Sequence, residues 1–170
     1  MKKNSPIQYY VEGEDEKRFL SVLKTELQMI RPGNVQVFNV ILQKFTNPRL
    51  IMLKPNTVVV LVYDTDTDSL GYLRDNIAML QTCPMVSEVI TIPQCRNLED
   101  ELVYASDVRN ALNLLNSNGR ANFKHDFIHT TNLAKKLIKH QLDIKKLWSR
   151  QAGSPFDVEP NMAEKIKLNR

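Results

Sequence analysis

The sequence contains few of the residues that bind zinc or form disulfides. Only two cysteines, Cys83 and Cys95, occur among its 170 residues, and they are not close-spaced as metal-binding pairs are. His125 and His129 lie four residues apart, but no glutamate or third ligand accompanies them as in a zinc protease. A zinc site is therefore not expected, and the cysteines are predicted to be free thiols in a reducing compartment.

Long hydrophobic runs are also absent. No stretch approaches the ~18 apolar residues of a membrane span, and the two lysines near the N-terminus are not followed by the apolar segment of a signal peptide. The excess of positive charge is small, 23 basic against 19 acidic side chains, which permits binding to nucleic acid without requiring it. We expect a cytoplasmic protein that has no membrane partner.

The hydrophobic residues alternate between strand and helix periods along the chain. Four β-rich stretches predict strands, at residues 7–11, 35–42, 58–63 and 86–92, the last of them closed by Pro93. Four stretches with helical spacing predict helices, at about residues 14–30, 70–80, 98–115 and 123–142. This order predicts an α/β fold, a compact domain with a central, largely parallel β-sheet flanked by helices. We expect an α/β core over residues 1–116, with residues 117–170 forming a helical C-terminal extension packed on the same domain.

The third predicted strand carries acidic residues at its end. Val58–Tyr63 is a nearly continuous apolar run, typical of a strand buried on both faces, and Asp64, Asp66 and Asp68 follow it at alternate positions. Carboxylates at the carboxyl end of such a strand lie where open α/β sheets build their sites, and their oxygens suit Mg²⁺ or Mn²⁺. The alternative is an acidic turn without function. We expect Asp64 and Asp66 to be metal ligands and Asp68 to begin the next helix.

The first predicted strand also ends in an acid. Glu12 follows it directly, and Gly13 then allows a sharp turn from strand to helix. If the first and third strands are neighbours, Glu12 and Asp64 face one crevice. The alternative is that the acids of residues 12–16 only favour a helix N-terminus, which we accept for Asp15 and, more weakly, for Glu16.

These two stretches resemble a known family. V-E-G-E-D-E at residues 11–16 resembles the Val-Glu-Gly-x-x-Glu opening of Toprim domains of the OLD and RloB groups, and V-V-V-L-V-Y-D-T-D-T-D at residues 58–68 resembles their second motif, a strand ending in Asp-x-Asp. The resemblance covers roughly the first hundred residues. It implies a Toprim-like fold with Glu12 as the acid/base residue and Asp64 and Asp66 as Mg²⁺ ligands, and we expect Glu12 to be a metal ligand as well. Gly13 and Glu16 would support them, as other positions of the opening motif.

The resemblance extends less closely to the residues after the fourth strand. RloB-like proteins have a glutamate at the start of an apolar helix there, and Glu99 would be the matching acid and a further metal ligand. Leu98 and Asp100 stand where those proteins tend to be aromatic, and Asp100 would at most support the site. The alternative for both acids is a solvated helix start that the helix dipole favours.

Basic residues supply two further candidates. Lys124 could neutralise the charge that develops on a phosphate, or it could be a solvated residue at a helix start. The C-terminal third is rich in basic residues, with Phe127 and Trp148 among them: Lys135, Lys136, Lys139, Lys145, Lys146 and Arg150. This stretch is either a nucleic-acid face or a solvated helix surface.

Three functions fit these residues. The first is a Mg²⁺- or Mn²⁺-dependent nuclease acting on DNA or RNA, with Glu12, Asp64 and Lys124 as catalytic residues. The second is a phosphatase of the haloacid-dehalogenase type, although Asp68 stands where that motif has Thr or Val. The third is a Toprim-like module that binds nucleic acid or a protein without catalysis. The resemblance also implies a role in phage defence with an ATPase encoded separately, because the chain has no G-x-x-x-x-G-K-[ST] motif, and a homodimer is a further candidate assembly.

Overall fold

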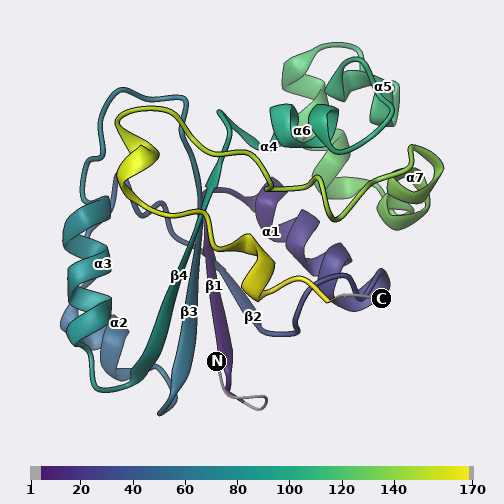
Figure 1. Cartoon of the computed structure of the whole chain (residues 1–170). Coiled ribbons are helices and arrows are strands. Elements are labelled where there is room, and N and C mark those ends of the chain that lie inside the picture. The colour runs from purple at the N-terminus through teal and green to yellow at the C-terminus, as the bar shows by residue number, and fades with distance from the viewer. Residues whose placement is uncertain (1–4, 169–170) are drawn as a thin grey trace.

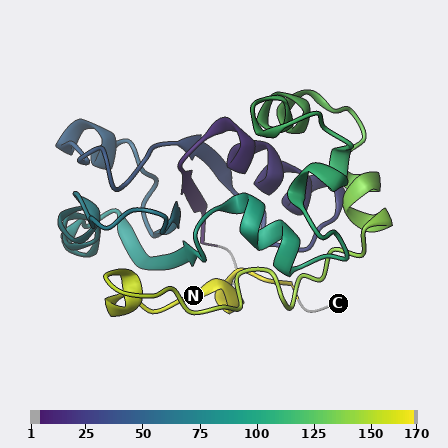
Figure 2. The same ribbon diagram turned by 90° about the horizontal axis from the view of Figure 1, so that it is seen from above.

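The computed structural model of the protein describes residues 5–168, except for the side chains of Arg120 and Val158. Four parallel strands form one sheet with helices on both faces (Figure 1), so the predicted α/β fold with a parallel sheet is confirmed. Helices α2 (Asn47–Ile51) and α3 (Leu73–Thr82) cover one face. Helix α1 (Glu14–Ser21) and the helices between residues 98 and 139 cover the other (Figure 2). No helix in this part of the chain is long and apolar enough to cross a membrane.

The order of the strands places the chain's two acidic strand ends side by side. The strands are β1 (Ile7–Val11), β2 (Asn34–Val37), β3 (Thr57–Asp64) and β4 (Val86–Gln94), in the spatial order β2-β1-β3-β4. From β1 the chain first adds β2 on one side, and then adds β3 and β4 on the other. The strand order therefore reverses between β1 and β3, and open α/β sheets bind ligands in the crevice at such a point.

Strand β3 is the centre of the core. All of its residues from Thr57 to Tyr63 are buried, as the apolar run predicts. Its side chains alternate between the two faces. Val58, Val60 and Val62 pack with α1 and the C-terminal helices, whereas Val59, Leu61 and Tyr63 pack on the α3 side.

The predicted helix over 14–30 ends earlier than expected. Helix α1 continues as a π-helix, Val22–Glu26, and the chain then leaves the helical path at Gln28, whose φ is 51°. Residues 29–31 pair instead with the end of the chain: the Arg31 N–H donates to the Ile166 carbonyl, and the Leu168 N–H donates to the Met29 carbonyl. The backbone hydrogen bonds of a distant segment thus replace those of the last helical turn.

Local turns shorten two other predicted elements. Strand β2 stops at Val37 rather than at residue 42, because the Asn39 side chain accepts hydrogen bonds from the backbone N–H groups of Ile41 and Leu42 and turns the chain. Helix α3 begins at Leu73, not near residue 70. The prediction that Asp68 begins this helix is therefore wrong, since Asp68 lies exposed in the preceding loop.

The two long helices predicted in the second half of the chain are each divided in two. Residues 98–115 form α4 (Leu98–Tyr104) and α5 (Ala111–Leu115), and residues 120–139 form α6 (Arg120–His129) and α7 (Leu133–Lys139). Between α4 and α5 the Ala105 carbonyl and the Asp107 N–H pair with residues beyond α7, at Asp143 and His140. These backbone groups are satisfied outside a helix, which is why the helical pattern does not continue.

The C-terminal segment, residues 156–165, covers the edge of the sheet that β4 forms. Two short 3₁₀ helices, Phe156–Val158 and Ala163–Lys165, flank a stretch in which the Met162 N–H donates to the Thr91 carbonyl and the Thr91 hydroxyl donates to the Pro160 carbonyl. Strand β4 runs through Pro93 to Gln94, so the prediction that Pro93 closes it is wrong. Proline is tolerated in an edge strand because one side of such a strand carries no ladder.

Candidate active site

Glu12 and Asp64 meet at the carboxyl edge of the sheet. Glu12 follows β1 and Asp64 ends β3, and these two strands are hydrogen-bonded neighbours. The Asp64 N–H donates to Glu12 Oε2 at 3.4 Å. A hollow of about 140 Å³ opens beside them. It is lined by Glu12, Asn39, Ile41, Leu42, Asp64, Asp66 and Thr67. The expectation that the two acids face one crevice, conditional on neighbouring strands, is confirmed.

The Asp64 carboxylate is held in place from β4 and from the C-terminal segment. Gln94 Nε2 donates to Asp64 Oδ1 at 2.6 Å, and Gln94 Oε1 accepts a hydrogen bond from Trp148 Nε1 at 3.2 Å. An indole nitrogen can only donate, so the Gln94 amide has its oxygen toward Trp148 and its NH₂ group toward Asp64. The chain Trp148–Gln94–Asp64 therefore keeps Asp64 Oδ1 as an acceptor.

Removing this donor should raise the pKa of Asp64. Gln94→Met preserves the volume of the side chain but removes the hydrogen bond that lowers the Asp64 pKa. We expect the Asp64 pKa to rise above its present value of about 8. Titration of ¹³C-labelled aspartate side chains by NMR measures it, with Gln36→Met on the exposed side of β2 as the control. An unchanged pKa in Gln94→Met would contradict the assigned orientation of the amide.

Burial and the neighbouring carboxylates disfavour the ionisation of Asp64 and Glu12. Burial raises the pKa of Asp64 to about 8, with added contributions from Glu12, Asp66 and Glu99 against the hydrogen bond from Gln94. Burial also raises the pKa of Glu12; Asp66 adds to this, whereas the Asp64 N–H, Asn39 and Lys124 oppose it. Four acids from three strand ends thus share one electrostatic environment, and a divalent cation would relieve their repulsion.

A second pair of acids lies directly behind Glu12. Asp15 and Glu16 are buried, and Glu16 Oε2 accepts a hydrogen bond from the Gly13 N–H at 2.8 Å. Burial raises the pKa of Glu16 to about 9, and the charges of Asp15 and Asp64 add to the rise. Asp15 Oδ2 is buried as well, and a lysine is its charged partner. The interpretation of these two acids as a simple helix start is therefore incomplete, because both face inward.

Gly13 contributes space rather than the sharp turn that the sequence indicates. Its φ of −138° and ψ of 178° are extended backbone that any residue adopts, so no special turn depends on it. A Cβ at this position would lie 2.6 Å from Asp15 Oδ1 and 2.9 Å from Glu16 Oε2. The glycine therefore makes room for two carboxyl groups that fold back over the end of β1.

Lys124 reaches this cluster from α6. Its Nζ lies 3.5 Å from Asp15 Oδ2, and its side chain is 60% exposed. Partial burial opposes its protonation, but the charges of Asp15, Glu99 and Glu16 outweigh this and raise the Lys124 pKa. A protonated amine thus stands beside the carboxylates, on a side chain that solvent can reach.

The remaining predicted residues lie away from this centre or serve the fold. Asp68 is exposed in its loop, and Asp100 pairs with Arg96 at 3.2 Å. Trp148 and Phe127 are both buried, so neither can stack on the bases of a nucleic acid as an aromatic of a basic face would. Residues that sequence reasoning missed are Gln94 and Asn39. A polar residue at the very end of β4 is the signal that points to Gln94, whereas the contact of Asn39 arises only when the chain folds.

Glu101, two residues beyond Glu99, is a structural residue. Its carboxylate is fully buried and accepts hydrogen bonds from the backbone N–H groups of Cys95 at 2.8 Å and Trp148 at 3.0 Å, and from Arg150 Nη2 at 3.0 Å. It fastens the segment that carries Trp148 to α4. Removing one member of a buried ion pair strongly destabilises the folded protein, because the other charge is left without its partner.

Glu101→Ala should therefore destabilise the protein markedly. It leaves two buried backbone donors without their acceptor and removes the carboxylate partner of Arg150, which keeps only the Asp100 carbonyl, and we expect the free energy of unfolding to fall by about 3 kcal/mol or more. Urea denaturation measures this, with Glu26→Ala at an exposed pair as the control, for which a change within about 0.5 kcal/mol is expected. Equal stability of both variants would show that Glu101 is not the anchor of the C-terminal segment.

The side-chain oxygens at this edge of the sheet suit a hard divalent cation. Glu12, Asp64 and Asp66 offer only oxygen ligands, which Mg²⁺ and Mn²⁺ prefer over zinc-type nitrogen and sulfur ligands. Within residues 5–168, no three acidic, histidine or cysteine side chains already converge as a metal-binding group. A bound ion would therefore draw the Asp66 side chain, which lies exposed in the loop after β3, toward Asp64.

Comparison with other proteins adds no further assignment. No protein-family model, no curated protein and no solved structure matches this chain.

Proposed function

We propose that the protein is a Mg²⁺- or Mn²⁺-dependent nuclease that hydrolyses phosphodiester bonds of DNA or RNA. The observation that carries this proposal is the meeting of Glu12 and Asp64 at the point where the strand order reverses, with Asp66 beside them. The two stretches that resemble Toprim motifs are the ones that end β1 and β3, which supports it. A partner ATPase belongs to the same proposal as a consequence of that resemblance, and a homodimer is a further candidate assembly.

Each residue has a role that follows from its place. Asp64 and Asp66, with Glu12 and Glu99 nearby, would hold the metal ion, which when bound polarises the phosphate and the attacking water. Glu12 accepts the proton of that water, because its raised pKa brings it closer to neutral pH, where a general base is most effective. Gln94 orients Asp64 through its hydrogen bond.

Lys124 supplies the positive charge. Its exposed side chain, now near Asp15, can turn toward a phosphate bound over Glu12 and Asp64. A cation placed there stabilises the negative charge that the phosphate gains in the transition state. The interpretation of Lys124 as a solvated helix residue does not account for its pairing with a buried acid.

The direct test is an activity assay with four substrates. Plasmid, single-stranded DNA, structured RNA and p-nitrophenyl phosphate are each incubated with the protein in Mg²⁺, Mn²⁺ or EDTA. We expect metal-dependent cleavage of a nucleic acid and none in EDTA. Hydrolysis of the phosphate monoester alone would support the phosphatase instead. Binding of metal without any turnover would support the non-catalytic module.

A further inference from the structure

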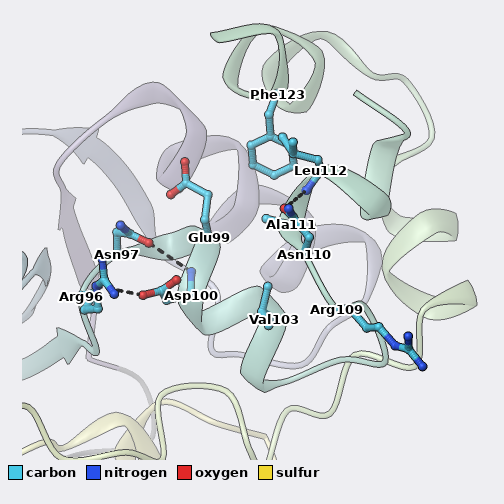
Figure 3. Close-up of a pocket in the computed structure, with 10 residues that line it drawn as sticks. All are labelled: Arg96, Asn97, Glu99, Asp100, Val103, Arg109, Asn110, Ala111, Leu112 and Phe123. Atoms are coloured by element: carbon cyan, nitrogen blue, oxygen red, sulfur yellow. Dashed lines mark hydrogen bonds and ion pairs between the residues drawn. The ribbon is translucent and has the colours of Figure 1, made fainter. Parts of the chain in front are cut away.

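A larger cavity lies next to the carboxylate cluster. It measures about 280 Å³ and opens between α4 and the pair α5–α6 (Figure 3). It is lined by Arg96, Asn97, Glu99, Asp100, Val103, Arg109, Asn110, Ala111, Leu112 and Phe123. Glu99 belongs both to this cavity and to the acidic cluster, because its charge raises the pKa values of Asp64 and Lys124. An occupant of the cavity would therefore lie directly beside the proposed reaction centre.

Two of the lining residues are asparagines whose side-chain oxygens and NH₂ groups are told apart by their hydrogen bonds. Asn97 Oδ1 accepts from the Asp100 N–H and Asn110 Oδ1 accepts from the Leu112 N–H, each at 3.0 Å. Both amide oxygens are thus engaged in capping a helix. The two NH₂ groups have no partner among the residues described, and they remain available to acceptor atoms of a ligand.

The other walls are apolar on one side and charged on the other. Val103, Leu112 and the Phe123 ring form the apolar part, while Glu99 offers acceptor oxygens beside them (Figure 3). Arg96 stands at the rim with a side chain that is 75% exposed. An apolar wall, polar side chains beside it and cations outside together match a nucleobase joined to a phosphate backbone.

We propose that this cavity binds one unpaired nucleobase, that of the nucleotide next to the phosphate that is cleaved. The proposal deepens the proposed function and rests on it. A base inside a duplex has both faces and its pairing edge covered, so only a single-stranded or extruded nucleotide can enter a cavity of this size. Arg96 and Arg109 then contact the phosphates on the outside, without reading sequence. The substrate class is thus nucleic acid with unpaired nucleotides, rather than intact duplex.

Binding of a fluorescent ten-nucleotide single strand, and of its duplex, in EDTA tests the proposal by anisotropy. Val103→Trp fills the cavity, and we expect it to weaken single-strand binding about tenfold or more, the scale of losing one stacked base. Asn97→Ser with Asn110→Ser keeps both helix caps but removes both NH₂ groups, and should weaken binding about fivefold with unchanged thermal stability. Met79→Trp on α3, at the opposite face of the sheet, is the control.

The outcomes separate this proposal from the nuclease itself. Wild-type affinity in both cavity variants, or duplex binding as tight as single-strand binding, overturns the cavity proposal even if the protein cleaves. Weakened single-strand binding in both cavity variants, with no metal-dependent cleavage by the wild type, supports the cavity and overturns the nuclease. No binding to any nucleic acid by the wild type overturns both.

Discussion

Glu12→Gln and Asp64→Asn should each reduce metal-dependent cleavage of nucleic acid by roughly 100- to 10,000-fold, the range for removing a positioned acid–base group. Glu12→Gln keeps the acceptor for the Asp64 N–H but cannot take a proton. Asp64→Asn keeps the shape of the side chain but removes a charge that would hold the metal ion. Both effects are measured as initial rates at saturating Mn²⁺, with an excess of the nucleic acid that the wild type cleaves.

Measuring the stability of the same variants shows whether a loss of cleavage is caused by unfolding. Each removes one member of a group of mutually repelling carboxyls, so in EDTA both should be at least as stable as the wild type at pH 8. Asp68→Asn, in the exposed loop, is the matched control and should cleave at the wild-type rate. Full activity in Glu12→Gln or Asp64→Asn would remove the basis for placing the reaction at this edge of the sheet.

Without divalent metal, the free energy of unfolding should fall by several kcal/mol between pH 5 and pH 9. Asp64 and Glu16 have folded pKa values of about 8 and about 9, above ordinary values of 3.8 and 4.5. At a pH between the ordinary and the raised pKa of each group, the folded state binds more protons than the unfolded state. Stability therefore decreases as the pH rises through this range. Each such proton contributes up to about 1.4 kcal/mol per pH unit. Urea denaturation in EDTA at half-unit pH steps measures the slope.

Two further measurements assign that slope to its residues. Glu16→Gln can still accept from the Gly13 N–H and donate to Asp15, but it carries no titrating proton, so its stability should fall less steeply with pH. Saturating Mg²⁺ should also flatten the curve for the wild type, because a bound cation favours the ionised carboxylates. A wild-type stability that rises from pH 5 to pH 9 in EDTA would contradict the buried, proton-holding state of these acids.

The part of this site that depends on strand order could be predicted from the sequence. An apolar run such as Val58–Tyr63 can hardly be anything but a buried strand, and an acid at its end has only one edge of the sheet to occupy. The same reasoning places Glu12 at that edge, because Glu12 directly follows the strand β1. Once β1 and β3 proved to be neighbours, both acids had to lie in the same crevice.

The rest depends on contacts between distant segments, which local patterns do not contain. Gln94 acquires its role because Trp148, fifty-four residues later, turns its amide. The helix over 98–115 was predicted as continuous because its apolar spacing is helical, but backbone groups at residues 105 and 107 are satisfied by residues 143 and 140. The inward direction of Asp15 likewise follows from the space beside Gly13, not from any periodicity.

The link from Trp148 through Gln94 to Asp64 also has a consequence for the order of events during protein synthesis. Strands β1 to β4 leave the ribosome well before Trp148 and the segment that Glu101 fastens. A nascent chain can therefore form its sheet while the Gln94 amide still turns freely and Asp64 lacks its fixed donor. Asp64 gains this fixed donor only when the last quarter of the chain has docked, so a stalled or prematurely terminated translation product would carry its acidic strand ends without it.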